Sequence, residues 1–276
     1  MPESAPRRRP RLSDQETRRR MLDAALALVE QDGLTVGLDH ISVEDVIQRA
    51  GVSRTAVYRR WPYKDLFHAD LLRELARGAA PASAVDEEAT RRLLGSVLDG
   101  RAAEPATPQG RHDLLTEMLR VSAADDFEAI HRSAGWRTYL ALQATFLSLP
   151  DGELRADVGE ALRLSESRFV DRVARGWELV ATALGYRPRP EAGGGFPLIA
   201  TLACASMRGL VLMALPDPEL LTRRVPANPT GASTPADWSL IGLAAAGIGV
   251  TFLELDPGVT WDDERTAAVR ALFAGP

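Results

Sequence analysis

Residues 42–67 read SVEDVIQRAGVSRTAVYRRWPYKDLF, and this stretch decides the fold. Its first residues, Ser42 to Asp45, fit a capping box, in which the serine hydroxyl accepts a free backbone N–H and a carboxylate reaches back to the cap. A short helix is therefore predicted to begin at Val43. It ends at Gly51, because a residue without Cβ adopts the left-handed conformation at no steric cost.

A second helix follows the glycine almost at once. Ser53 is a good N-cap, the helix is predicted over Arg54 to Trp61, and Pro62 ends it. Two short helices joined by a tight glycine turn make a helix-turn-helix. The second helix of this motif fits the major groove of DNA.

The second helix carries side chains suited to both base and phosphate contacts. Arg54 can bond guanine through two N–H groups, and Thr55 offers a hydroxyl or a methyl for thymine. Cations and an aromatic hydroxyl further along would meet phosphates, although Arg59 and Arg60 could also be plain solvated surface. The predicted DNA contacts are Ser42, Ser53, Arg54, Thr55, Tyr58, Arg59, Arg60 and Lys64.

With an amphipathic helix before it and Gly33 between, the stretch from Ser42 to Phe67 resembles the DNA-binding domain of TetR-family transcriptional regulators. The resemblance covers about the first quarter of the chain. It implies a homodimer, an operator of two inverted half-sites, and repression relieved by a small molecule in the C-terminal domain. Three features depart from the family's usual pattern: Ile47 replaces a small residue, Trp61 replaces phenylalanine, and the loop after Gly33 is long.

The rest of the chain reads as helical, so the fold class is all-α. We expect a flexible basic arm (1–12), a three-helix DNA-binding domain (13–78) and a larger helical domain for effector binding and dimerisation (79–276). Arg7 to Arg11 of the arm either remain a tail or enter a minor groove. Further helices are predicted over 13–31, 64–77, 86–99, 111–132, 136–149, 151–184 and 261–273. The proline-rich connector 216–237 is expected to be mobile or disordered.

Two apolar runs, 196–215 and 238–255, are hydrophobic nearly all round and need cover on every side. Gly242, Gly247 and Gly249 allow close helix packing, so we expect these runs to form the seam of a homodimer. A central helix pair inside a monomer is the alternative. The first run carries Arg208 and the second is short, so neither is read as a membrane span.

Composition bounds the function. The 276 residues include one cysteine and four histidines at spacings unlike a metal site, so neither a metal nor another cofactor is expected. No phosphate loop, dinucleotide fingerprint, nucleophile elbow or zinc-protease motif is present, which argues against an enzyme. The net charge of −5 does not oppose DNA binding, because the basic residues cluster near the motif. Lys64 is the only lysine.

The effector site is less well marked. Aromatic rings and a polar amide recur at helical spacing at Trp136, Tyr139, Gln143 and Phe146, and we expect these residues to line a ligand pocket. The sequence therefore predicts a cytoplasmic DNA-binding regulator, a ligand-responsive repressor with an unidentified small-molecule effector. The alternatives are a helix-turn-helix that docks another protein and a helical enzyme without a recognisable motif.

Overall fold

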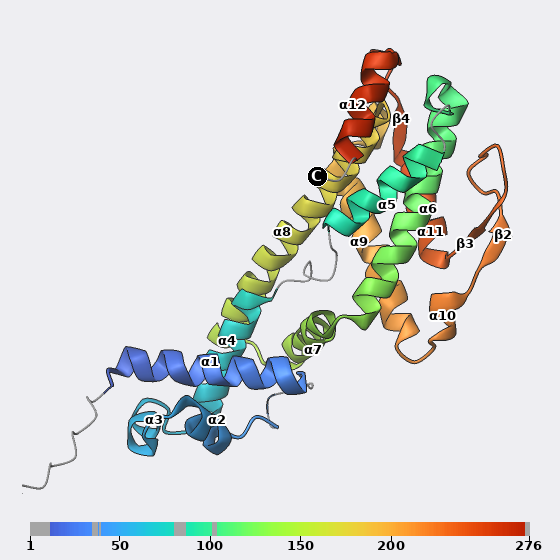
Figure 1. Ribbon diagram of the computed structural model, residues 1–276. Helices are drawn as coiled ribbons and strands as arrows, with labels where there is room; N and C mark the ends of the chain where they lie inside the picture. The colour runs from blue at the N-terminus through green and yellow to red at the C-terminus, as the bar shows by residue number, and fades with distance from the viewer. Residues whose placement is uncertain (1–11, 35–37, 39, 80–86, 101–103, 274–276) are drawn as a thin grey trace, which may run out of the picture. The chain divides into compact units, whose positions relative to one another are not determined.

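The computed structural model describes residues 12–34, 38, 40–79, 87–100 and 104–273. The fold is all-α, as predicted, with four strands of three residues each among the described elements (Figure 1). The helices are α1 (Asp14–Asp32), α2 (Val43–Ala50), α3 (Arg54–Arg60), α4 (Lys64–Gly78), α5 (Glu87–Gly100), α6 (Pro108–Arg132), α7 (Ala134–Ser148), α8 (Glu153–Ala183), α9 (Gly195–Ala214), α10 (Glu219–Thr222), α11 (Leu240–Phe252) and α12 (Asp263–Phe273). The arm Arg7 to Arg11 lies outside the described residues.

The strands form two separate antiparallel pairs. β1 (Tyr186–Pro188) pairs with β4 (Leu253–Leu255), and β2 (Val225–Ala227) pairs with β3 (Ala236–Trp238). Each pair is too short to build a layer of its own, so the helices supply the core.

The chain divides into two compact units. The first unit combines Met1–Ala80 with Arg137–Ser165, and the second combines Pro81–Trp136 with Glu166–Pro276. The first unit thus contains most of α7 and the beginning of α8 in addition to α1–α4. A division into compact units does not test which residues bind DNA and which bind an effector, so the predicted domain boundary at residue 78 stays a prediction.

In the first unit, α1 packs on α2, α3 and α4. The side chains of Met21 in α1, Val57 in α3, and Phe67 and Leu71 in α4 are fully buried. Burying each of these large apolar side chains stabilises the fold by about 1.5–3 kcal/mol. This core fixes the orientation of the short helices α2 and α3, which are too short to be stable alone.

In the second unit, α6 is the central helix and packs against α5, α9 and α11. Two of the three glycines of α11 pack closely on α6 of the same unit, whereas a Cβ on Gly247 would meet nothing within 4 Å. A Cβ on Gly249 would lie 2.6 Å from Cδ1 of Leu119, and one on Gly242 would lie 3.3 Å from the backbone oxygen of Arg120. Both contacts are to α6, so most of α11 is buried within the unit.

The connector 216–237 is ordered, contrary to the sequence prediction. It contains α10 and the hairpin of β2 and β3. The hairpin loop is held on α6, where Asp113 accepts from the backbone N–H of Ser233 at 3.0 Å and Nε2 of His112 lies 2.8 Å from the oxygen of Thr230. Because Asp113 is buried, its hydrogen bonds hold the hairpin loop in place. The proline-rich composition of the connector gives no sign of this contact.

Candidate nucleic-acid interface

The turn between α2 and α3 has the geometry that the sequence predicts. Gly51 is left-handed, with φ 63° and ψ 32°. Ser42 Oγ accepts from the backbone N–H of Asp45 at 3.3 Å, and Ser53 Oγ accepts from that of Ala56 at 3.2 Å. Both serines predicted to contact DNA therefore serve as helix caps, and each hydroxyl hydrogen remains available as a donor.

One face of α3 is fixed in the core and the opposite face is open. Val57 is buried against α1, whereas Arg54, Thr55 and Tyr58 are exposed on the other side. Arg54 and Thr55 lie in the first helical turn, the part of a recognition helix that reaches base edges. The structure thus brings these predicted residues together on a single surface.

Two of the predicted phosphate-binding side chains already have acidic partners. The Tyr58 hydroxyl donates to Oε1 of Glu44 at 2.6 Å, and Nη2 of Arg59 lies 2.5 Å from Oδ1 of Asp14. The hydrogen bond from Tyr58 lowers the pKa of Glu44 and raises that of the phenol. Glu44 and Asp14 were not predicted, because residues far apart in sequence give no signal of the pairing.

The remaining cations lie where α3 ends and α4 begins. Arg60 is half-buried, with its guanidinium 5.3 Å from the centre of the Trp61 ring, and Lys64 is exposed at the first position of α4. Tyr63, the N-cap residue of α4, is 73% exposed and was not singled out from the sequence. An exposed tyrosine beside an exposed lysine at a helix N-terminus is a suitable surface for phosphate.

Trp61 is fixed both by packing and by a hydrogen bond. Its ring meets that of Phe67 edge to face at 5.2 Å, and its indole N–H donates to Asp70 at 3.2 Å. Asp70 also lies 3.5 Å from Arg18 of α1 and 3.5 Å from Arg73 of α4. Asp70 therefore joins the end of α3 to two other helices, a connection that phenylalanine at position 61 would lack.

The four predicted pocket residues lie in different parts of the fold. Trp136 belongs to the second unit, is 2% exposed and lines a cavity there. Tyr139, Gln143 and Phe146 belong to the first unit and are not among the residues that line this cavity. Gln143 donates from Nε2 to the Tyr139 hydroxyl at 2.8 Å. A pocket formed by all four stays a prediction.

Residues 21–69, from α1 to the beginning of α4, match the family model described as bacterial regulatory proteins, tetR family. The N-terminal domain belongs to the TetR family. The TetR-family domain binds DNA through its helix-turn-helix, and the family consists of regulators, not enzymes. The matched range includes both α2 and α3.

No curated protein matches the chain at the significance level applied. Two solved structures are similar in part. NalD of Pseudomonas aeruginosa, titled the secondary repressor of the MexAB-OprM multidrug efflux pump, is 20% identical over 75% of this chain and 88% of its own, with a TM-score of 0.37. SmeT, titled the repressor of the Stenotrophomonas maltophilia multidrug efflux pump SmeDEF, is 20% identical over 90% of this chain and 98% of its own, with a TM-score of 0.36. At such TM-scores neither likeness bears on the function of this protein.

Two further observations concern metals and membranes. Within the described residues, no group of three or more His, Cys, Asp or Glu side chains could hold a metal ion. One described helix, α9, is long and apolar enough to cross a membrane by length and composition. Since one side of α9 packs on α6 and α11, and core helices of soluble proteins pass the same criterion, this is weak evidence for a span.

Proposed function

We propose that this protein is a ligand-responsive repressor that binds, as a homodimer in the cytoplasm, an operator of two inverted half-sites. The observation that supports the proposal is the exposed face of α3, anchored by Val57 and opening with Arg54 and Thr55. A helix held in this way projects its first turn into a major groove. Arg54 and Thr55 would read bases, and the remaining predicted contacts would bind phosphates.

The dimer would form chiefly through α9. Its outer face exposes residues three or four apart that are mostly small or apolar: Thr201, Ala205, Gly209, Leu212 and Met213. An exposed apolar stripe of this length is a typical self-association surface. The second predicted run contributes less, because α11 exposes mainly Gly247 and Thr251.

DNA selection from a random pool, using the full-length protein, tests the proposal directly. We expect the enriched sequences to contain an inverted repeat whose half-sites are one helical turn apart, about 34–36 Å. Enrichment of no sequence over the starting pool, at low salt, would contradict the assignment.

Size-exclusion chromatography with light scattering tests the dimer separately. Leu212→Arg places a charge in the exposed stripe of α9 and should yield monomers that bind a half-site but lose affinity for the full operator. Leu147→Arg is the matched control, since Leu147 is 78% exposed at the end of α7 and belongs to the first unit. A dimer that survives Leu212→Arg would place the interface elsewhere.

A further inference from the structure

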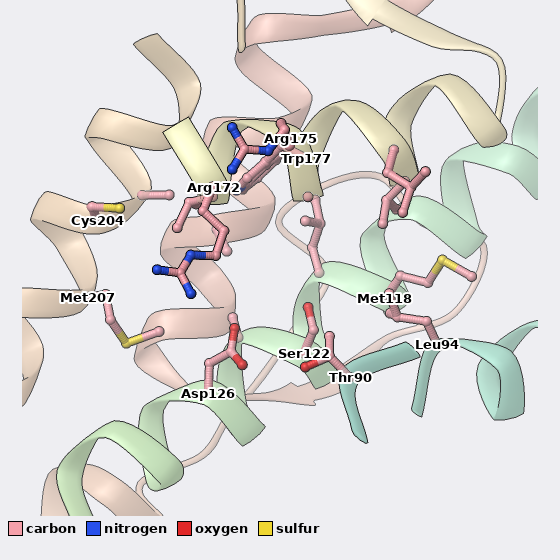
Figure 2. A pocket seen from close by; sticks show the side chains of 18 of the residues that line it. Thr90, Leu94, Met118, Ser122, Asp126, Arg172, Arg175, Trp177, Cys204 and Met207 are labelled. Carbon is pink, nitrogen blue, oxygen red and sulfur yellow. The ribbon is translucent and has the colours of Figure 1, made fainter. Parts of the chain in front are cut away.

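The second unit contains a large, partly open cavity. Its volume is about 850 Å³, and its lining residues come from α5, α6, the beginning of α7, α8, α9, α11 and α12 (Figure 2). Most of the lining is apolar, with aromatic rings from Trp136, Phe169 and Trp177. A cavity of this size and character accommodates a drug-sized organic molecule.

Asp126 is the one carboxylate among the described residues that line this cavity. It comes from α6, and Figure 2 shows the carboxylate directed into the space between α6 and α8. Within the described chain, no hydrogen bond or ion pair is made by Asp126. Asp126 is half-buried, so its carboxylate on this mostly apolar wall loses part of its hydration, and a cation in the cavity would offset that loss.

The electrostatics of Asp126 agree with the geometry. Burial, with a smaller contribution from neighbouring Asp125, raises the pKa of Asp126 to about 7. A cation within a few ångströms would have lowered this pKa. The local environment of the carboxylate therefore lacks positive charge and would gain stability from it.

Four arginines also line the cavity. Arg168, Arg172 and Arg175 of α8 are exposed, so water screens their charges, whereas Arg91 of α5 is half-buried. Figure 2 shows the Arg172 guanidinium turned toward the cavity without reaching Asp126. On α9, Cys204 lines the same space, and burial raises the pKa of its thiol to about 11, so it is uncharged. Among the described residues that line the cavity, Asp126 is thus the ionisable group that supplies negative charge.

We propose that this cavity binds an organic cation with aromatic or other apolar rings, and that Asp126 supplies the opposite charge. Rings of the ligand would pack on Trp136, Phe169 and Trp177, whose faces also attract cations. Only the role of this cavity as the effector site of a repressor rests on the proposed function. Ligand binding can be measured in the absence of DNA.

Binding should release protons near neutral pH. With a pKa of about 7, Asp126 is half protonated in the empty cavity at pH 7, and a cation favours its ionised form. The other charged groups around the cavity are Asp125, Arg91, Arg168, Arg172 and Arg175. Calorimetry in buffers of different ionisation enthalpy therefore measures the proton released by Asp126.

Tetraphenylphosphonium and tetraphenylborate are suitable probes, because they have nearly the same size and shape and opposite charges. Isothermal titration calorimetry with the full-length protein should show tighter binding of the phosphonium. In Asp126→Asn the preference for phosphonium over borate should fall at least about tenfold, the equivalent of one pKa unit. Asp126→Glu should retain the preference.

Asp125→Asn is the matched control, because it removes the same charge from the adjacent, exposed position on α6. It should leave the preference within about twofold. The proposal is overturned if Asp126→Asn keeps the full preference, if the borate binds more tightly to the wild type, or if the phosphonium gives no binding up to about 1 mM. Thermal unfolding confirms that each variant is folded.

DNA release is measured separately, by fluorescence anisotropy of a labelled operator. Tight phosphonium binding without release of DNA would contradict the ligand response in the proposed function and leave the cation site intact. Normal DNA binding without any phosphonium binding would overturn the cation site alone.

Discussion

Tyr58 of α3 donates a hydrogen bond to Glu44 of α2, with the two oxygens 2.6 Å apart. The pair joins the two helices of the helix-turn-helix across the exposed surface. It also places a carboxylate beside a residue expected to bind phosphate. The Glu44 carboxylate and a DNA phosphate therefore compete as acceptors for the Tyr58 hydroxyl. The negative charge of Glu44 also repels phosphate and so lowers the affinity for any DNA.

Glu44→Gln should strengthen DNA binding. The substitution removes a charge that repels phosphate and leaves an amide oxygen that still accepts from Tyr58. We expect an affinity gain of about two- to fivefold for specific and non-specific DNA alike, as fits an exposed charge. Fluorescence anisotropy at several salt concentrations measures it.

Tyr58→Phe separates the hydrogen bond from the charge. Tyr58→Phe removes the hydrogen bond between Tyr58 and Glu44 but keeps the Glu44 carboxylate, so no gain in DNA affinity is expected. A neutral substitution at Asp151, fully exposed between α7 and α8, controls for net charge alone. Equal gains for Asp151→Asn and Glu44→Gln would show that position is irrelevant.

Lys64→Ala and Arg54→Ala should have different signatures. Loss of Lys64 should weaken binding to every sequence and reduce the salt slope by about one phosphate contact. Loss of Arg54 should cost about 1–3 kcal/mol at a single base pair and little elsewhere. Titrations against the operator and its single-base variants distinguish the two, and indistinguishable profiles would refute the division between phosphate and base contacts.

Gly51→Ala should destabilise the first unit. A Cβ at Gly51 would meet nothing within 4 Å, so the cost comes from the left-handed backbone alone, about 1–2 kcal/mol. Gly78→Ala also meets open space but lies in α4 with helical backbone, and should be neutral or stabilising by up to about 1 kcal/mol. Urea unfolding compares them. Equal effects would mean that the conformation of the turn is not what requires glycine.

Asp126→Asn should stabilise the protein in a pH-dependent manner. The pKa of Asp126 in the folded protein, about 7, lies above its ordinary value of 3.8. The folded state therefore favours the protonated carboxyl, and wild-type stability falls as the pH rises from about 4 to about 7. The gap in thermal midpoint between Asp126→Asn and wild type should be larger at pH 8 than at pH 5. A constant gap would show that Asp126 titrates normally.

The helix-turn-helix was predictable because its determinants are local. Ser42, Gly51 and Ser53 act within four residues of themselves, so the sequence alone specifies both caps and the turn. The bonds between elements were not predictable. Asp14 meets Arg59 across 45 positions, and the identity of such a partner depends on how α1 crosses α3.

The cavity shows the same limit. Helical spacing predicted that Trp136 and Tyr139 line one pocket. Spacing alone does not reveal that the two side chains belong to different compact units. Asp126 was missed because two consecutive aspartates on a helix resemble a solvated surface. Only the packing of α8, α9 and α11 around that position makes one of them a lining residue.

The solitary amine of Lys64 gives this protein a built-in chemical reporter. It is the only lysine in 276 residues and lies exposed at the first position of α4. An acylating reagent therefore has one lysine side chain to modify. If Lys64 contacts phosphate as predicted, bound DNA should reduce its acetylation, which mass spectrometry measures without an engineered label.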